Sequence, residues 1–454
     1  MYKKYILIST LPFILFAISI CSCEKMVSVQ PPINQITNSS IFSSDQSATS
    51  VVLGMYVKMV GSTNYDYLLT VLPSLTSDEL NNYSSNISFI SYATNNIPVN
   101  EGYADIIWSY SYNIIYQANA FLDNISASQA VSTPAKNQLS GEALFMRSFM
   151  YYTLTNFFGS VPLVTTSNVE VTASAPRAPE DSIYRQIIND LTNATGLLGN
   201  GYITSDRSRI NKYAAMSLLA RVYLYCHQYD SAIYYSSTVI SSGMYSLNTT
   251  LSNVFQKSSP ETIFQYYTSN GYTDLGTNFI PTGQLPNFAF TTDFLNNIST
   301  GDKRVASWMG TTLNSGITYY YPYKYKNRST NTTNPEYLVL LRLAEQYLIR
   351  AEAMADENNL SGSASDLNVV RNRAGLSSIS PSTSSALLTA ISNERRIELF
   401  SEWGHRWFDL KRNGLINSVM IAIKPSSWSA TDSLYPIPIT EISSNPNLIQ
   451  NPGY

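Results

Sequence analysis

Charged residues are scarce in this 454-residue chain. Asp, Glu, Lys and Arg make up 13% of it, about half of the roughly 25% that is usual for soluble domains. The formal net charge is −3 and no run of basic residues occurs, so the chain lacks the electrostatic footprint of a nucleic-acid-binding protein. Serine, threonine, asparagine and 34 tyrosines replace the missing charges. This composition favours neutral, hydrogen-bonding ligands over polyanions.

Histidine and cysteine are also scarce. The two histidines and three cysteines provide no zinc-ligand spacing and no HExxH motif, and neither a GxSxG motif nor a phosphate-binding glycine loop is present. We therefore expect no metal site and no cofactor. Cys226 lies in the apolar helical stretch ARVYLYCHQY, and we interpret it as a buried structural thiol.

Long apolar runs are absent except at the N-terminus. Residues 6–20 are apolar and follow Lys3 and Lys4, but this run is too short to span a bilayer, so residues 1–22 are predicted to be a secretory signal peptide that is removed. Ser22 favours cleavage just before Cys23, which would then carry the lipid of a lipoprotein; a plain cleaved leader is the alternative. Residues 23–40 are interpreted as a lipidated, flexible tether.

Apolar residues at helical spacing dominate the rest of the chain. The clearest stretch, residues 141–164, ends with Gly159 as a helix cap and Pro162 as a block to continuation. Ala220 and Ala232 lie in two short predicted helices, at a spacing that resembles the tetratricopeptide pattern of small residues between paired helices. We predict a mainly all-α single domain over residues 41–454, built on a tetratricopeptide-like helical-repeat scaffold.

Two stretches, at about 62–104 and 246–336, break the helical pattern. Both are rich in Tyr, Asn, Ser, Thr and Gly, and long loops in compact domains are usually functional. Aromatic rings surrounded by amide and hydroxyl groups suit sugars, which have apolar C–H faces and polar rims. The candidate ligand-binding residues are Asn81, Tyr83, Tyr92, Tyr272, Trp308, Tyr319, Tyr320 and Tyr321. The alternative is that such rings pack the loops onto the scaffold, as we expect for Trp108, Trp403 and Trp407 in the core.

Paired carboxylates raise the possibility of a glycosidase. Asp78 and Glu79 are adjacent, and Glu394, Glu398 and Glu402 follow one another at four-residue spacing. A general acid needs a raised pKa, whereas the interleaved arginines at 395 and 396 would lower it. We interpret the second group as a structural ion-pair network and predict that the protein is not an enzyme.

Four ordered blocks resemble the SusD/RagB family of outer-membrane lipoproteins of Bacteroidetes. They are GEALFMRSFMYYTLTNFFGSVPLV (141–164), LRLAEQYLIRAEAMA (341–355) with LNVVRNRAGL (367–376), NERRIELFSEWGHRWFDLKRNG (393–414) and YPIPITEISSNPNLIQNPGY (435–454). The segments at 77–79 and 107–125 also fit. The resemblance implies that Arg395, Glu398, Arg406 and Asp409 hold helices together, and it assigns no ligand contact to the blocks.

The resemblance also implies a function. It implies a surface-exposed, lipid-anchored protein of the outer membrane that binds a nutrient without catalysis and delivers it to a SusC-type TonB-dependent transporter. The low charge and the Tyr/Asn-rich loops favour a glycan ligand; an oligopeptide is the alternative, and a glycoside hydrolase is a third, disfavoured hypothesis. We expect alanine at Trp308 or at residues 319–321 to weaken binding and leave the melting temperature nearly unchanged.

Overall fold

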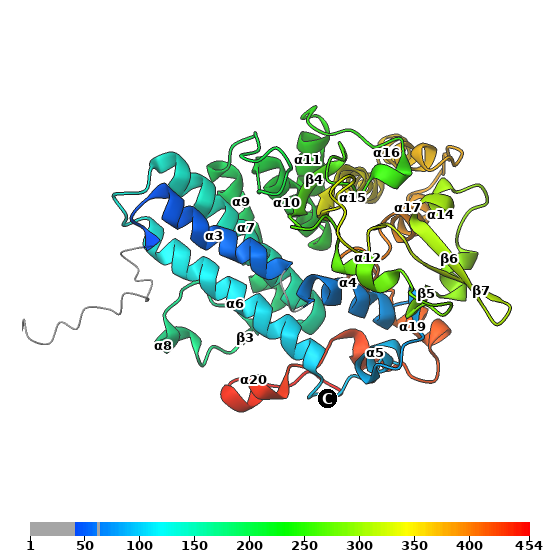
Figure 1. Ribbon diagram of the computed structural model, residues 1–454, viewed down its shortest axis with the longest axis horizontal. Coiled ribbons are helices and arrows are strands. Elements are labelled where there is room, and N and C mark those ends of the chain that lie inside the picture. Colours follow the sequence, from blue (N-terminus) through cyan, green and yellow to red (C-terminus); the bar gives the residue numbers. More distant parts are fainter. Residues whose placement is uncertain (1–40, 61–63) are drawn as a thin grey trace, which may run out of the picture.

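The computed structural model describes residues 41–60 and 64–454 (Figure 1). The predicted signal peptide, the tether and Cys23 lie outside these residues. Within the described part, no helix is both long enough and apolar enough to cross a membrane. Most of the regular structure is helical, which confirms the predicted fold class.

Long helices form the scaffold and pack against one another largely in chain order. They are α3 (Asp45–Met59), α6 (Gly102–Ile125), α7 (Thr133–Phe158), α9 (Glu180–Leu197), α10 (Lys212–Tyr225), α11 (Tyr229–Ile240), α15 (Leu343–Asp356), α16 (Leu360–Arg373) and α17 (Ser384–Glu398). Ala220, Ala232 and Ala353 share one buried cluster between α10, α11 and α15. Small side chains at this crossing let the helices approach closely, as their spacing predicts.

Helix α7 ends at the predicted glycine cap but begins at Thr133, before the predicted stretch at 141–164. The Ser132 hydroxyl accepts a hydrogen bond from the backbone N–H of Ala135 at its start, which satisfies one of the free donors of the first turn. At its end Gly159 has a φ of +72°, and a Cβ there would lie 3.1 Å from the Leu434 side chain. Glycine therefore serves both the turn and the close approach of the C-terminal segment.

Shorter elements fill the remaining length. The short helices are α4 (Tyr65–Thr76), α5 (Ile87–Ala93), α8 (Val169–Thr172), α12 (Asp274–Phe279), α13 (Thr292–Asn296), α14 (Lys303–Trp308), α18 (His405–Arg412), α19 (Ile416–Ile423) and α20 (Ile439–Ser444), with 3-10 turns η2 (Leu251–Asn253) and η3 (Ala430–Ser433). The strands form antiparallel pairs: β1 (Leu80–Asn82) with β5 (Phe288–Phe290), β2 (Val161–Pro162) with β3 (Arg177–Ala178), β4 (Thr262–Tyr266) with β8 (Leu338–Arg342), and β6 (Met309–Asn314) with β7 (Ile317–Pro322).

The first irregular stretch, 62–104, contains more helix than predicted. Residues 65–76 form α4, in which every residue is buried, including Asp66 and Pro73. A helix covered on all sides has no polar face, so its apolar residues run on without the spacing that marks an amphipathic helix. The prediction of a loop is therefore wrong for these residues. Trp108, Trp403 and Trp407 lie in the core, which confirms their assignment.

Candidate ligand-binding face

Asn81, Tyr83 and Tyr319 come together at the edge of the short sheet pairs. Strand β1 pairs with β5, with Asn81 opposite Ala289, and β5 contacts β7. Tyr83 directly follows β1, and its side chain interacts with the Asn81 side chain. The Tyr83 ring is 39% exposed and meets the Tyr319 ring edge-on, with centroids 5.0 Å apart. We call Tyr83 and Tyr319 the tyrosine pair.

The three consecutive tyrosines of β7, in the hairpin formed by β6 and β7, differ in exposure. Tyr319 is half-exposed and faces Tyr83. Tyr320 points to the other side of the strand and packs partly against the core. Tyr321 is buried, with its ring so close to Gly310 that a Cβ there would overlap it at 2.2 Å. The prediction that Tyr321 contacts ligand is therefore wrong, because its ring covers the glycine of the facing strand.

Tyr92 and Trp308 are also not ligand contacts, contrary to the prediction. Both are fully buried. The Tyr92 hydroxyl donates a hydrogen bond of 2.7 Å to the Glu101 carboxylate. The Trp308 indole N–H donates to the backbone oxygen of Leu251 at 2.8 Å. With their polar atoms paired inside the protein, these rings hold the irregular segments onto the scaffold.

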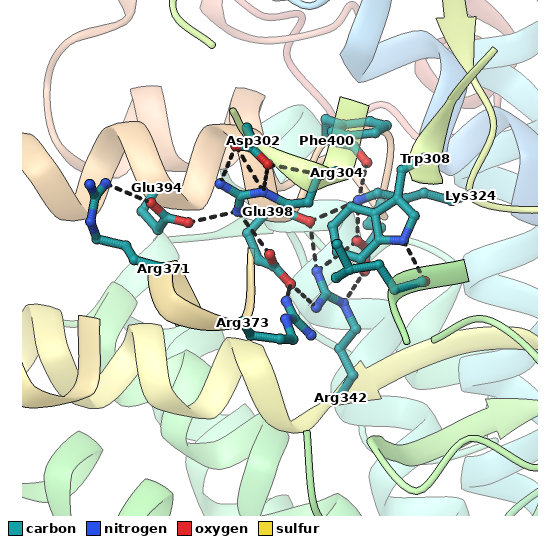
Figure 2. Close-up of polar contacts among 12 residues, drawn as sticks. Asp302, Arg304, Trp308, Lys324, Arg342, Arg371, Arg373, Glu394, Glu398 and Phe400 are labelled. Atoms are coloured by element: carbon teal, nitrogen blue, oxygen red, sulfur yellow. Dashed lines mark hydrogen bonds and ion pairs between the residues drawn. The ribbon is translucent and has the colours of Figure 1, made fainter. Parts of the chain in front are cut away.

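Trp308 packs on a buried network of arginines and glutamates (Figure 2). The Nζ atom of Lys324 lies 4.9 Å from the Trp308 ring. Glu398 pairs with Arg304 at 2.9 Å and with Arg342 at 2.5 Å, and also with Arg373. Burial alone would raise the pKa of Glu398, but the three guanidinium groups outweigh burial and hold it well below its usual value. The Glu398 carboxylate is therefore ionised and paired inside the protein, which is typical of a structural network.

The ion-pair interpretation of the Glu stripe is thus confirmed, but with other partners than those expected. Arg395 pairs with Asp409 at 2.7 Å, and Arg396 pairs with Asp78 at 2.9 Å. Arg395 directly follows Glu394, so these two side chains leave the helix in different directions, and Arg395 pairs with Asp409 rather than with Glu398. The contacts of Arg395, Arg406, Glu398 and Asp409 hold helices together, as the resemblance implied.

A cavity of about 280 Å³ opens where α3 ends and α4 begins. We call it the α4 cavity. It is lined by Val57, Val60, Asp66, Tyr267, Thr268, Ser269, Asn270, Tyr272, Thr273 and Asp274. Tyr272 is the one predicted candidate among them. Contacts run from α12 to α4, from α4 to β1, and on through β5 to β7, so adjoining elements link the cavity to the tyrosine pair. We call the cavity and the tyrosine pair together the candidate ligand-binding face.

The carboxyl groups of the α4 cavity differ from those of the network. Burial and, to a smaller extent, the neighbouring Asp274 raise the pKa of Asp66 to about 8. Burial also raises the pKa of Asp274. Sequence analysis missed Asp66, and its signal was a single carboxylate inside the apolar run YDYLLTVL. Elsewhere in the described residues, no group of three or more His, Cys, Asp or Glu side chains could hold a metal ion.

Two family models match most of the chain. One, described as "Starch-binding associating with outer membrane", matches residues 27–224. The other, described as "SusD family", matches residues 264–424. The chain belongs to the SusD/RagB family.

Relatives and solved structures agree with this membership. A SusD-like protein P25 of Formosa agariphila is 24% identical over 97% of this chain and 98% of its own length. A SusD superfamily protein of Bacteroides vulgatus superposes with a TM-score of 0.81, at 19% identity, over 90% of this chain and 99% of its own. A structure described as a laminarin-binding SusD-like protein gives 0.78 at 22% identity, covering 91% of this chain and 100% of that one. At these identities the structures establish the fold.

The sequence blocks that resemble the SusD/RagB family do not form the candidate ligand-binding face. The block at 393–414 supplies the carboxylates and arginines of the buried network. Asn81, Tyr83, Tyr272 and Tyr319 all fall outside the four blocks. In this SusD/RagB protein these blocks therefore contribute to the scaffold, and the candidate ligand-binding residues lie between them.

Proposed function

We propose that this protein binds a glycan at the cell surface, without catalysis, and works with a SusC-type TonB-dependent transporter in uptake. The observation that carries the proposal is the half-exposed tyrosine pair beside Asn81, linked by adjoining elements to the α4 cavity and Tyr272. Flat rings next to amide and hydroxyl groups offer both the stacking surface and the hydrogen bonds that a sugar requires.

Family membership supports the same proposal. One matched family model carries starch binding and outer-membrane association in its description, and one structural neighbour is described as laminarin-binding. Both ligands are glucans, which are uncharged. The low charge of this chain fits such a ligand.

Calorimetry with starch- and laminarin-derived oligosaccharides tests the proposal. We expect Tyr83→Ala and Tyr319→Ala each to weaken binding about tenfold, or ~1.4 kcal/mol, because each removes one of the two rings against which a sugar would stack. Tyr234→Ala is the matched control, since Tyr234 is 62% exposed on α11, away from the pair. Equal loss in all three variants would contradict the proposed site.

The two alternative functions, oligopeptide binding and glycoside hydrolysis, would give different results with the same purified protein. If no oligosaccharide in a broad panel binds while a peptide mixture does, the oligopeptide hypothesis replaces the glycan. If the purified protein releases product and one Asp or Glu substitution abolishes the release, the protein is a glycoside hydrolase. Neither result depends on the tyrosine variants.

We further propose that a lipid on Cys23 anchors the protein in the outer membrane, facing outward. Cys23→Ser is expected to release the protein from the membrane fraction. Cys21→Ser is the matched control, because Cys21 belongs to the part of the leader that is predicted to be removed. Protease treatment of intact cells tests the outward orientation. Copurification with the SusC-type transporter tests the proposed partnership. Retention of the Cys23→Ser protein in membranes would contradict the anchor.

A further inference from the structure

The α4 cavity contains a buried carboxylate oxygen without a partner. Asp66 is 3% exposed and lines the cavity. The backbone N–H groups of Asp66 and Tyr67 interact with its carboxyl group, but its Oδ1 atom has no hydrogen-bond donor among the described residues. Buried polar atoms in folded proteins are nearly always paired, and exceptions call for an explanation. We expect the missing donor to come from the molecule that the cavity binds.

The cavity also lacks a positive charge. Asp274 lines it together with Asp66, and its charge acts on the Asp66 carboxyl group. No Lys or Arg is among the described residues that line the cavity. The basic residue in the last turn of α3, Lys58, has its Nζ over the Tyr110 ring, 5.9 Å from the centroid. Two carboxyl groups that share a site without a cation disfavour each other's ionised form, so a bound cation would be attracted by both.

Building on the proposed glycan-binding function, we propose that the α4 cavity binds a sugar with a free primary amine, and that its ammonium group lies between Asp66 and Asp274. An ammonium group brings a positive charge and three donors. A sugar hydroxyl brings one donor and no charge, so it satisfies the unpaired oxygen without neutralising the pair. A metal ion is less suited, because the described residues offer no cluster of three ligating side chains of the usual types.

The rest of the lining fits a sugar ring. The Tyr267 ring is 53% exposed, and Tyr272 is half-buried beside it, so both can lie against the apolar face of a pyranose. Thr268, Ser269 and Asn270 supply hydroxyl and amide groups for the polar rim. The volume is near the lower end of ordinary small-molecule sites, ~300–1,000 Å³, so the cavity is suited to one terminal sugar.

Acetylation of the amine removes both the charge and two of the donors, and this makes the proposal testable with matched ligands. The probes are oligomers of β-1,4-linked glucosamine, the same oligomers fully N-acetylated, and glucose oligomers of equal length and linkage. Calorimetry on the purified protein should show the glucosamine oligomer binding at least tenfold more tightly than the other two.

Two variants report on the two carboxyl groups. Asp66→Asn and Asp274→Asn should each remove most of the preference for the amine, measured as the ratio of the affinities for the glucosamine and glucose oligomers. Asp274 is the partly exposed member, so its variant keeps the test valid if the buried substitution impairs folding. Asp230→Asn, at an exposed position in the first turn of α11, is the matched control and should retain the full preference.

Each contrary result identifies what is wrong. Equal binding of the three oligomers, unaffected by either variant, overturns the amine site and leaves glycan binding intact. If none of the oligomers binds while a peptide with a free amine binds and depends on Asp66, the proposed glycan function is wrong as well. Heat from calcium chloride alone that Asp66→Asn abolishes would replace the ammonium site with a metal site.

Discussion

Glu398 and Asp66 are both buried carboxylates, but they face opposite surroundings. Glu398 is met by Arg304, Arg342 and Arg373, and its pKa lies well below the usual value despite its burial. Asp66 is met by a second carboxyl group, and burial raises its pKa to about 8. Burial alone therefore does not decide the charge state; the groups that share the site do.

These two carboxylates show how a structural site differs from a candidate binding site in this molecule. The Glu398 carboxylate is paired with guanidinium groups of the same chain on both of its oxygens (Figure 2). At Asp66 an oxygen has no donor in the described chain, and the site opens to a cavity. A buried polar atom without a hydrogen-bond partner lowers the stability of the fold. Groups with strongly shifted pKa values are frequent at functional sites.

Removing the glutamate at the centre of the network should have the largest effect. Glu398→Ala leaves three buried guanidinium groups without their shared partner, so we expect the free energy of unfolding to fall by about 5 kcal/mol, the upper end for a broken buried pair. Urea denaturation measures it. Glu357→Ala, at an exposed position after α15, should change stability by less than about 0.5 kcal/mol. Equal stability of the two variants would show that the network does not stabilise the fold.

Removing the ring that covers the network should have the next largest effect. Trp308→Ala opens a cavity beside Lys324 and Arg342, and we expect a loss of about 4 kcal/mol. This replaces the expectation that the melting temperature would hardly change. Thermal unfolding measures the loss, and calorimetry on the folded fraction should show unchanged affinity for oligosaccharide. An affinity loss without a stability loss would return Trp308 to the candidate ligand-binding face.

Replacing Asp66, the buried carboxyl group of the α4 cavity, should raise the free energy of unfolding instead of lowering it, by an amount that depends on pH. Its pKa is about 8 when folded and about 3.9 when unfolded, so between these values the unfolded chain has already lost a proton that the folded chain retains. The free energy of unfolding therefore falls as pH rises through this window. Asp66→Asn removes this slope and should gain on the order of 3 kcal/mol over the wild type at pH 8, with little gain at pH 4.

Urea denaturation at pH 4, 6 and 8 tests this expectation. Glu79, whose pKa burial raises to about 7, is present in both proteins and cancels in the difference. The Asp230→Asn control should run parallel to the wild type at all three values. A parallel curve for Asp66→Asn would show that Asp66 is ionised in the folded protein.

Tyr319 and Tyr321, two residues apart on β7, should give the smallest difference in stability between variants. Tyr321→Ala exposes the face of Gly310 and should cost about 2 kcal/mol, since its ring is buried. Tyr319→Ala removes a half-exposed ring and should cost less than about 0.5 kcal/mol while weakening oligosaccharide binding. Thermal unfolding and calorimetry on both variants measure the contrast. The reverse ranking in stability would contradict the burial assigned to the two rings.

The scaffold could be predicted because its residues carry local signals. Gly159 ends α7, and Ala220 with Ala232 marks a close helix pair, since caps and spacing act within a few residues of one another. The network was predicted only as a group. The stripe containing Glu398 indicated ion pairs, but Arg304 and Arg342 come from distant segments that helical spacing cannot connect.

The candidate site was predicted less well, because composition does not report exposure. Tyr83 and Trp308 come from similar Tyr- and Asn-rich sequence, yet one is 39% exposed and the other is fully buried. Asp66 was missed because an acidic residue inside an apolar run has no counterpart nearby in the sequence. Its neighbour Asp274 is brought to it only by the packing of α12 against α4.

The sequence by itself determined the helical class, the glycine cap that ends α7, the resemblance to the family and a composition low in charge and rich in tyrosine. These follow from residue spacing, local caps and composition, which act along the chain. Only the tertiary structure decided which rings are buried, which arginines meet which glutamates and where a carboxylate is left without a donor. Those outcomes depend on segments more than 50 residues apart, such as Arg342 and Glu398, and on whether each buried charge finds its opposite once the chain has folded.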